Sequence, residues 1–431
     1  MTLPENLLHF IWKYRLYRVR GMASVSGNNL DVLDTGTHNT DAGADFHSAR
    51  IRIGMTEWSG NVEIHWRTSE WELHRHHWDQ AYNNVVLHVV YEHDKTITRA
   101  DGTIPETLEL KPLIPAHILP KYREMMAHMH WIPCEKHIHR VSSFQLTSWL
   151  SRLLVERFEH RVAAVYQLLA QQRGSWEDTC YLWMARSFGF KVNAPAFEQL
   201  AYAVPFNLVV RYRHRPTAIE ALFFGQAGLL DTIGFTDDYP RALQAEYAYL
   251  RKLHRLLPMD ASAWKSMRTR PGNFPSMRIA QFAAFCQRLP QLLPAILETP
   301  TREMPGALFG ALPVNRYWKN HYRFDVPAAV HSTQLGDQSM ATLLINAVAV
   351  ILFAYGKYIG KEMYIYRAIA LLERLKAEDN VIIRRFSTLG VQAAHAAESQ
   401  ALLQLKACYC DNKKCLDCSI GLSVIKYKKD D

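Results

Sequence analysis

The stretch Gly60-Asn61-Val62-Glu63-Ile64-His65-Trp66 alternates apolar and polar side chains. Alternation with a period of two predicts a β-strand, with the apolar side chains on its core face and with Glu63 and His65 together on the opposite face. Residues 49–53 alternate in the same way, and Gly54 to Thr56 can turn the chain between the two segments. The sequence therefore predicts an antiparallel pair of strands joined by a short turn.

Asp45 stands just before the first of these strands, so the pairing can bring its carboxylate beside that of Glu63. Two converging carboxylates offer the hard oxygen ligands that Mg²⁺ or Mn²⁺ prefers. Such a cation polarises a phosphoryl oxygen and lowers the pKa of a bound water, which becomes the attacking nucleophile. We expect Asp45 and Glu63 to hold the metal and His65 to orient or activate the water. Asp41, in the same loop, is more simply interpreted as a turn residue.

The segments around these two strands predict a small mixed α/β domain. We expect an opening helix at residues 5–17, strands at 30–33, 85–91 and 107–110, and a helix at 71–83. The strand at 85–91 is almost continuously apolar, which is typical of a strand that is buried on both faces.

This order of elements resembles the PD-(D/E)XK nuclease superfamily, in which an acidic residue is followed by an acidic-x-Lys element on the next strand. Asp45 matches the first acid and Glu63-Ile64-His65 the second element, over about 90 residues of similarity. Ala44 replaces the proline and His65 the lysine. The resemblance implies a restriction-endonuclease-like mixed sheet and hydrolysis of phosphodiester bonds in nucleic acid. It also implies that Tyr82, on the following helix, helps to position the phosphate.

The whole chain also resembles an uncharacterised bacterial family known only as a domain of unknown function. Four segments carry this similarity: residues 38–43, 60–65, 82–90, and Tyr409-Cys410 with Cys415-Leu416-Asp417-Cys418. The resemblance brings no established activity with it.

The histidines leave two other functions open. Most of the twenty lie in the first third of the chain, and His74 and His77, three apart on the expected helix, can join His65 in a zinc site. That arrangement would make the protein a zinc-dependent hydrolase. His76 is expected to point to solvent and His88 to be a hydrogen-bonded core residue. Alternatively, His65 marks a degenerate nuclease core in a non-catalytic protein that binds nucleic acid or acts in assembly.

Beyond residue 141 the pattern becomes helical. Amphipathic spacing predicts helices at residues 144–172, 238–257, 277–293, 339–358 and 363–375. We therefore expect three parts: an α/β domain at residues 1–141, an all-α domain at 142–405, and a cysteine-rich tail at 406–431.

Four of the seven cysteines lie close together in the tail: Cys408, Cys410, Cys415 and Cys418. Soft thiolates gathered in this way are typical of a Zn²⁺ site, with an iron–sulfur cluster as the alternative. Cys415-x2-Cys418 is a good half-site and Cys410 adds a third ligand. Cys408 can face away in a Cys-x-Cys segment, in which case the fourth ligand comes from elsewhere in the chain.

The formal net charge of +9 favours an acidic partner such as nucleic acid, with DNA weakly favoured over RNA. The most basic loop contains Arg268 and Arg270, and Arg278 opens the helix that follows it. Arginines at a helix start suit a phosphate, so we expect these three residues to contact nucleic acid. Oligomeric state is left open.

We expect a cytoplasmic protein that is not inserted in a membrane. Glu5, Lys13 and Arg15 interrupt the apolar N-terminal stretch, which excludes a signal peptide there. The longest charge-free run, residues 338–356, contains Asn346 and is interpreted as a buried helix. In a reducing compartment the cysteines are expected to be metal ligands or free thiols.

Overall fold

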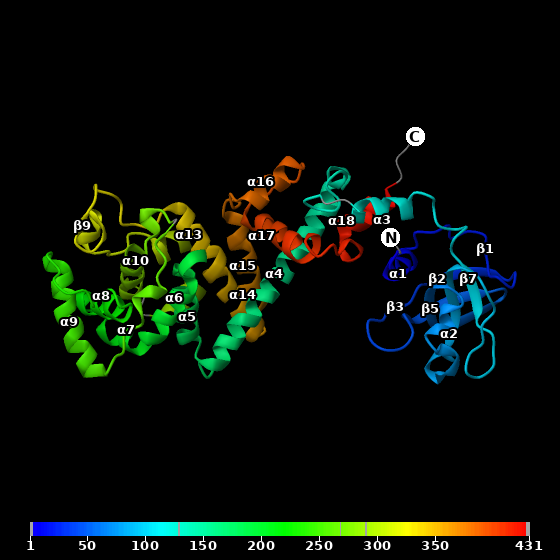
Figure 1. Cartoon of the computed structure of the whole chain (residues 1–431), viewed down its shortest axis with the longest axis horizontal. Coiled ribbons are helices and arrows are strands. Elements are labelled where there is room, and N and C mark those ends of the chain that lie inside the picture. The colour runs from blue at the N-terminus through cyan, green and yellow to red at the C-terminus, as the bar shows by residue number, and fades with distance from the viewer. Residues whose placement is uncertain (1–2, 128–129, 268, 289–290, 428–431) are drawn as a thin grey trace. The chain divides into compact units, whose positions relative to one another are not determined.

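The computed structural model describes residues 3–427 except 128–129, 268 and 289–290. The chain forms two compact units (Figure 1). The N-terminal unit comprises Met1–Trp149, Thr388–Val391 and Leu405–Asp431, and the helical unit comprises Leu150–Ser387 and Gln392–Gln404. The cysteine-rich tail thus belongs to the same unit as the sheet domain. A segment this short has little apolar surface to bury by itself, and it packs its helix α18 (Ser419–Lys426) against α3 (Ile118–Ala127).

A mixed seven-stranded sheet forms the centre of the N-terminal unit, in the order β1-β2-β4-β5-β6-β7 with β3 paired to β4. Helix α1 precedes the sheet in sequence and α2 connects β5 to β6. The bounds of these elements are α1 (Asn6–Lys13), β1 (Met22–Ala23), β2 (Asn29–Asp34), β3 (Thr37–His38), β4 (Phe46–Ile53), β5 (Thr56–Arg67), α2 (Glu70–Leu73), β6 (Val85–Glu92) and β7 (Glu106–Glu109).

The strand pairing explains which faces are buried. β2, β4 and β5 are antiparallel neighbours, whereas β5, β6 and β7 run parallel. β6 lies between two partners, and most of its apolar side chains are buried, as its composition predicts. The expected strands are confirmed, and β4 and β5 extend further than predicted.

The expected single helix at residues 71–83 is wrong. α2 ends at Leu73, and the rest of the segment forms two short 3₁₀ turns at His76–Trp78 and Gln80–Tyr82. Arg75 adopts a left-handed conformation with φ of 66°, which ends the helical path. Asp79 then caps the second turn by accepting a hydrogen bond from the backbone N–H of Ala81. Because the chain changes direction at Arg75, His76 and His77 point in other directions than they would on a continuous helix.

The expected helical region is confirmed, with the predicted long helix present as α4, although the region is not all-α because it contains a short two-stranded sheet. Its elements are α4 (Ser143–Gln171, beginning before the unit boundary), α5 (Trp176–Phe188), α6 (Phe190–Ala203), α7 (Phe206–Tyr212), α8 (Pro216–Gln226), α9 (Asp238–His254), α10 (Pro275–Arg288), α11 (Leu292–Glu298), α12 (Met304–Phe309), β8 (His321–Arg323), β9 (Val326–Pro327), α13 (Asp337–Leu343), α14 (Ala349–Tyr358), α15 (Glu362–Arg374), α16 (Val381–Thr388) and α17 (Ala396–Gln404). The predicted helix at 277–293 is present as α10, which ends at Arg288. Residues 289–290 lie outside the described part of the chain, and α11 begins at Leu292.

One helical stretch within the described residues, Asp337–Tyr358, is long and apolar enough to cross a membrane by length and composition. It consists of α13, a π-helical turn and α14. Of its most apolar window, 67% is buried inside the protein, so the stretch serves as a core helix here.

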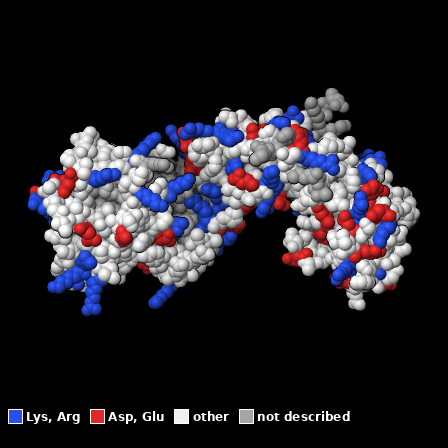
Figure 2. Space-filling model, in the orientation of Figure 1, with Lys and Arg blue, Asp and Glu red and all other residues white. Residues whose placement is uncertain are grey.

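Basic and acidic side chains both lie on the face drawn in the space-filling view (Figure 2). On the face drawn in Figure 2, Lys and Arg side chains are interspersed with Asp and Glu over the N-terminal unit. The helical unit carries additional basic side chains on the same face.

Candidate functional site

The sheet register brings Asp45 and Glu63 together. Phe46 of β4 pairs with Val62 of β5, so Asp45, one residue earlier, stands opposite Glu63. The backbone N–H of Asp45 donates to Glu63 Oε2 at 3.1 Å, and the backbone N–H of Ile64 donates to Asp45 Oδ2 at 2.9 Å. Each carboxylate is therefore fixed by a backbone N–H of the segment that carries the other or its neighbour in sequence.

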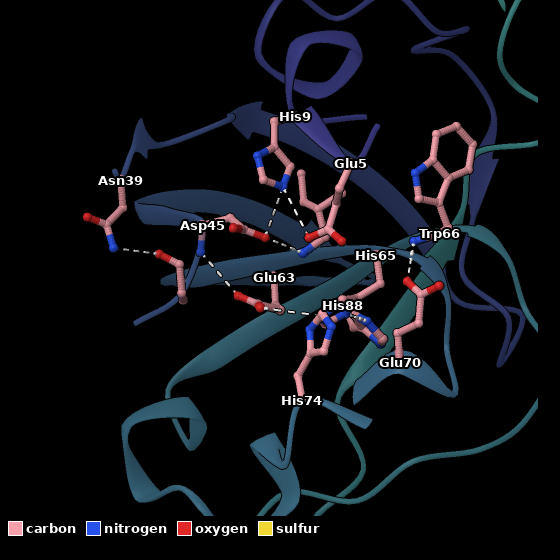
Figure 3. A network of polar contacts seen from close by, with 12 residues as sticks. Glu5, His9, Asn39, Asp45, Glu63, His65, Trp66, Glu70, His74 and His88 are labelled. Carbon is pink, nitrogen blue, oxygen red and sulfur yellow. Dashed lines mark hydrogen bonds and ion pairs between the residues drawn. The ribbon is translucent and has the colours of Figure 1, made fainter. Parts of the chain in front are cut away.

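The loop before β4 also positions Asp45. The Asn39 side-chain amide donates to the carbonyl oxygens of Asp41, Ala42 and Ala44 at 3.1–3.3 Å, and the Asn39 backbone N–H donates to the Asp45 carbonyl oxygen (Figure 3). Asp41 lies in this turn with its side chain exposed. Asn39 is a positioning residue that the sequence pattern did not reveal.

Glu63 is 4% exposed and lies against two imidazoles. Its Oε1 atom lies 3.1 Å from His76 Nε2 and 3.7 Å from His65 Nε2. Burial raises the pKa of Glu63, the contact with His76 lowers it, and the charge of Asp45 raises it again. The net effect is a raised pKa, so the ionised form of this carboxylate needs compensation by nearby positive charge.

His65 is fully buried and occupied on both ring nitrogens. Its Nδ1 atom lies 2.9 Å from His88 Nε2, and its Nε2 atom lies 3.1 Å from His74 Nδ1 (Figure 3). Burial, followed by the neighbouring imidazoles, lowers the pKa of His65 well below its ordinary value, and burial lowers the pKa of His88 to about 3. Both rings are thus neutral. The ring of His65 is 0% exposed, so any action of His65 on a catalytic water, as the sequence predicts, would pass through its contacts with His74 and His88.

His76, rather than His77, joins this cluster. The expectation that His76 points to solvent is wrong: its side chain is buried and its ring stacks on Tyr82 with centroids 3.9 Å apart. The left-handed Arg75 turns His76 inward, whereas the His77 ring packs against Trp78. His74 remains exposed.

Tyr82 lies at the wall of the site. Its side chain is 8% exposed, and burial, followed by the charges of Glu63 and Asp45, raises the pKa of its hydroxyl to about 12. It therefore stays protonated and supports His76 by stacking.

Helix α1 contributes two residues that the sequence reasoning missed. His9 Nε2 lies 3.3 Å from Asp45 Oδ2 and 3.7 Å from Glu5 Oε1 (Figure 3). Burial would lower the pKa of His9, but the two carboxylates outweigh it and raise the pKa to about 9. The i,i+4 spacing of Glu5 and His9 on the amphipathic helix was the available signal.

Two groups of possible metal ligands occur among the described residues. One is Glu5, His9 and Asp45, and the other is His65, His74 and His76; the ligand atoms within each group lie within 4.8 Å of one another. Glu63 connects the two groups, because its carboxylate contacts both the Asp45 backbone and His76. The site therefore mixes carboxylate oxygens with imidazole nitrogens.

The three arginines that are predicted to contact nucleic acid differ in their environments. Arg268 lies outside the described residues, and Arg270 is exposed. Arg278 is 5% exposed, and its guanidinium donates to Asn273, Gln281 and Ser339. Arg278 is therefore not available to a phosphate, because its hydrogen bonds are made inside the helical unit.

In the tail, Cys408 does not line the small cavity that the other three cysteines share. The cavity is lined by Cys410, Cys415 and Cys418 together with Cys134, which lies in the segment between β7 and α4. Burial, followed by the charges of neighbouring cysteines, raises the pKa values of Cys134 and Cys410, and raises that of Cys415 to about 12. These shared effects reflect how close the four thiols lie.

No curated protein and no solved structure matches the chain. A family model does match, and it covers residues 5–381, which include the sheet, the acid and histidine cluster and most of the helical unit. The chain therefore belongs to the family described as protein of unknown function DUF2851.

Proposed function

We propose that the N-terminal unit is a metal-dependent phosphodiesterase that hydrolyses nucleic acid. The observation that carries the proposal is the reciprocal fixing of Asp45 and Glu63, each carboxylate accepting a backbone N–H from the segment that carries the other. Two acids held in this way are preorganised for a shared cation rather than free to turn away.

The strand order supports the proposal. Helix α1 is followed by the antiparallel strands β2, β4 and β5, then by α2 and by β6, which pairs parallel to β5. This is the order of helix, strands, helix and strand that the PD-(D/E)XK resemblance implies. Asp45 directly precedes β4 and Glu63 lies on the neighbouring strand β5, which is consistent with that resemblance.

The donor set fits a divalent cation. Asp45 and Glu63 supply oxygen, and the His9 and His76 Nε2 atoms lie 3.3 and 3.1 Å from these carboxylates. Mg²⁺ or Mn²⁺ suits the carboxylates, and Mn²⁺ also accepts imidazole. Such a cation supplies Lewis-acid polarisation of the phosphoryl oxygen and lowers the pKa of a bound water.

The chain's own residues then have distinct roles. Glu63 and Asp45 bind the cation, and Tyr82 holds His76 against Glu63 by stacking. His65 acts as a positioning residue, because its Nε2 atom fixes His74 Nδ1 at 3.1 Å while its own ring is fully buried. His74 is exposed, so it is the imidazole that can accept a proton from the attacking water.

A zinc-dependent hydrolase is the second candidate, and one observation favours it. His65 Nε2 lies 3.1 Å from His74 Nδ1, and Glu63 Oε1 lies 3.1 Å from His76 Nε2 and 3.7 Å from His65 Nε2. Ligands of a tetrahedral zinc ion with bonds of 2.0–2.1 Å stand about 3.4 Å apart. In this reading His76 takes the place expected for His77, and Glu63 becomes the fourth ligand.

The test is cleavage of DNA and RNA by the full chain in Mg²⁺, Mn²⁺ or Zn²⁺, with Glu63→Gln and Asp45→Asn as variants. We expect both variants to lose at least about 100-fold in rate, since even outer-shell partners of a metal are worth 10–100-fold. Glu57→Gln is the matched control, because Glu57 lies on the same strand but pairs with Arg50 at the surface.

Unchanged cleavage in Glu63→Gln would reject the proposal. Binding of nucleic acid without cleavage in any of the three metals would leave the non-catalytic binding or assembly function instead. Activity with Zn²⁺ alone would select the zinc hydrolase.

A further inference from the structure

Cys134 lies far from the tail in sequence, because the residues of the helical unit come between them in the chain. It nevertheless lines the same cavity as Cys410, Cys415 and Cys418. All four belong to the N-terminal unit. Cys134, Cys415 and Cys418 are 6–8% exposed. Packing of an apolar core does not require four thiols from two distant segments to converge, whereas a soft metal ion does.

The cavity suits one ion. Its volume is about 10 Å³, room for roughly a single water molecule. Besides the cysteines its lining is mainly aliphatic, with Pro133, Ile138, Leu405 and Ile420. Among the described residues no carboxylate or imidazole lines it. A closed set of four sulfur ligands is the arrangement of a structural zinc site, and the space is too small for a multinuclear cluster.

The N-terminus of α18 lies at Cys418. Burial raises the pKa of the Cys418 thiol, and the backbone N–H groups of Ile420 and Gly421 at this helix start oppose the shift. Gly421 allows the start of α18 to lie against Cys415, because a Cβ atom there would lie 2.0 Å from the carbonyl oxygen of Cys415. The turn between Cys410 and Cys415 is closed by backbone hydrogen bonds and by a left-handed Lys413 with φ of 51°.

Lysine side chains lie near the thiols. Lys414 lines the cavity, and the positive charges of Lys413 and Lys406 act on Cys415 and Cys410. A zinc ion with four thiolates carries a net negative charge, and these lysines offset part of it.

From this geometry we infer that Cys134, Cys410, Cys415 and Cys418 hold one structural zinc ion, and that Cys408 is not a ligand. The ion links the segment between β7 and α4, which carries Cys134, to the C-terminal tail. These two segments of the N-terminal unit are separated in sequence by the helical unit. Binding energy of this kind contributes directly to folding, because the site does not exist in the unfolded chain.

The first test is the metal content of the full chain by elemental analysis. We expect Cys134→Ser and Cys415→Ser each to lose one equivalent of zinc relative to the wild type. The matched control is Cys408→Ser, from the same tail segment, and it is expected to keep that equivalent. Loss of zinc in Cys408→Ser with retention in Cys134→Ser would overturn the ligand assignment.

The second test needs no variant and therefore does not depend on a variant's folding. Zinc X-ray absorption of the wild type is expected to show a shell of sulfur ligands at about 2.3 Å. Substitution with Co²⁺ is expected to give the visible bands of a tetrahedral thiolate site. A spectrum without sulfur ligands, or iron with acid-labile sulfide, would overturn the proposal.

The test also separates this site from the acid and histidine cluster. A zinc ion held by His74 and His76 would be lost in His74→Ala but retained in Cys134→Ser. The cysteine site is expected to show the opposite behaviour, so the fate of the proposed hydrolase does not decide the fate of the structural zinc.

Discussion

His76 Nε2 lies 3.1 Å from Glu63 Oε1, although the spacing of His76 on a regular helix would place it on the outer face. The inward direction results from the left-handed conformation of Arg75, which ends α2 and reverses the chain. Two consecutive histidines therefore have different environments: His76 faces the buried carboxylate, and His77 packs on Trp78 at the surface of the unit.

This relationship predicts a sharp difference between two neighbouring substitutions. His76→Ala is expected to lower metal affinity at the acid cluster by about 10–100-fold, because it removes an imidazole in contact with Glu63. His77→Ala is expected to leave affinity within about twofold of the wild type. Titration of Mn²⁺ into each full-length variant measures this, and equal effects of the two substitutions would contradict the assignment.

Gly421→Ala is expected to disturb the cysteine site. A Cβ at this position would lie 2.0 Å from the carbonyl oxygen of Cys415, a backbone atom that cannot rotate away. We expect weaker zinc retention under chelation and a lower melting temperature of the N-terminal unit, with a loss of about 1–3 kcal/mol. The control is Gly272→Ala, because a Cβ there meets no atom within 4 Å. Zinc retention equal to that of the control would show that the close approach is not required.

Glu220 predicts a pH dependence of stability in the helical unit. Burial raises its pKa to about 7, while its contacts with Tyr239 and Asn315 oppose the shift. The unfolded chain therefore loses this proton at lower pH than the folded chain, and stability falls as pH rises from about 4.5 to about 7. The full loss of stability, about 3 kcal/mol, applies above the pKa of Glu220 in the folded state. It is absent below the pKa of Glu220 in the unfolded state.

Glu220→Gln removes that titration. We expect the variant to be more stable than the wild type by up to about 3 kcal/mol at pH 8 and nearly equal to it at pH 4. Urea denaturation followed by circular dichroism from pH 4 to pH 8 measures the difference. Glu159→Gln, at an exposed residue paired with Lys357, is the control and should show no such trend. A constant difference between Glu220→Gln and the wild type across the range would refute the assignment.

Arg278 and Arg270 are expected to behave in opposite ways. Arg278→Ala removes three buried or part-buried hydrogen bonds and a contact over the Phe190 ring at 4.3 Å, so we expect a loss of about 2–4 kcal/mol in stability. Nucleic-acid affinity per folded molecule should not change. Arg270→Ala is expected to leave stability within about 0.5 kcal/mol and to weaken binding in a salt-dependent manner. Unfolding curves combined with binding at two salt concentrations distinguish the two. A stable Arg278→Ala variant with reduced affinity would contradict this prediction.

The sequence pattern predicted that Asp45 lies beside Glu63, because the face on which a side chain lies and the register of the two strands both depend on local features. A period of two fixes which side chains share a face, and a short turn fixes the register of the two strands. The pattern did not predict the place of His76, since one left-handed residue has no periodic signal. It also did not predict His9, whose contact with Asp45 depends on how α1 packs on the sheet.

The sequence by itself determined the alternating strands, the helical character of the second unit and the existence of a cysteine-rich tail, because these follow from side-chain periodicity and composition along neighbouring positions. The tertiary structure alone decided that His65 is sealed between His74 and His88, that Arg278 turns inward, and that Cys134 meets Cys410, Cys415 and Cys418. Each of these contacts joins residues that are brought together by packing rather than by spacing, and packing is set by the whole fold, not by any segment of it.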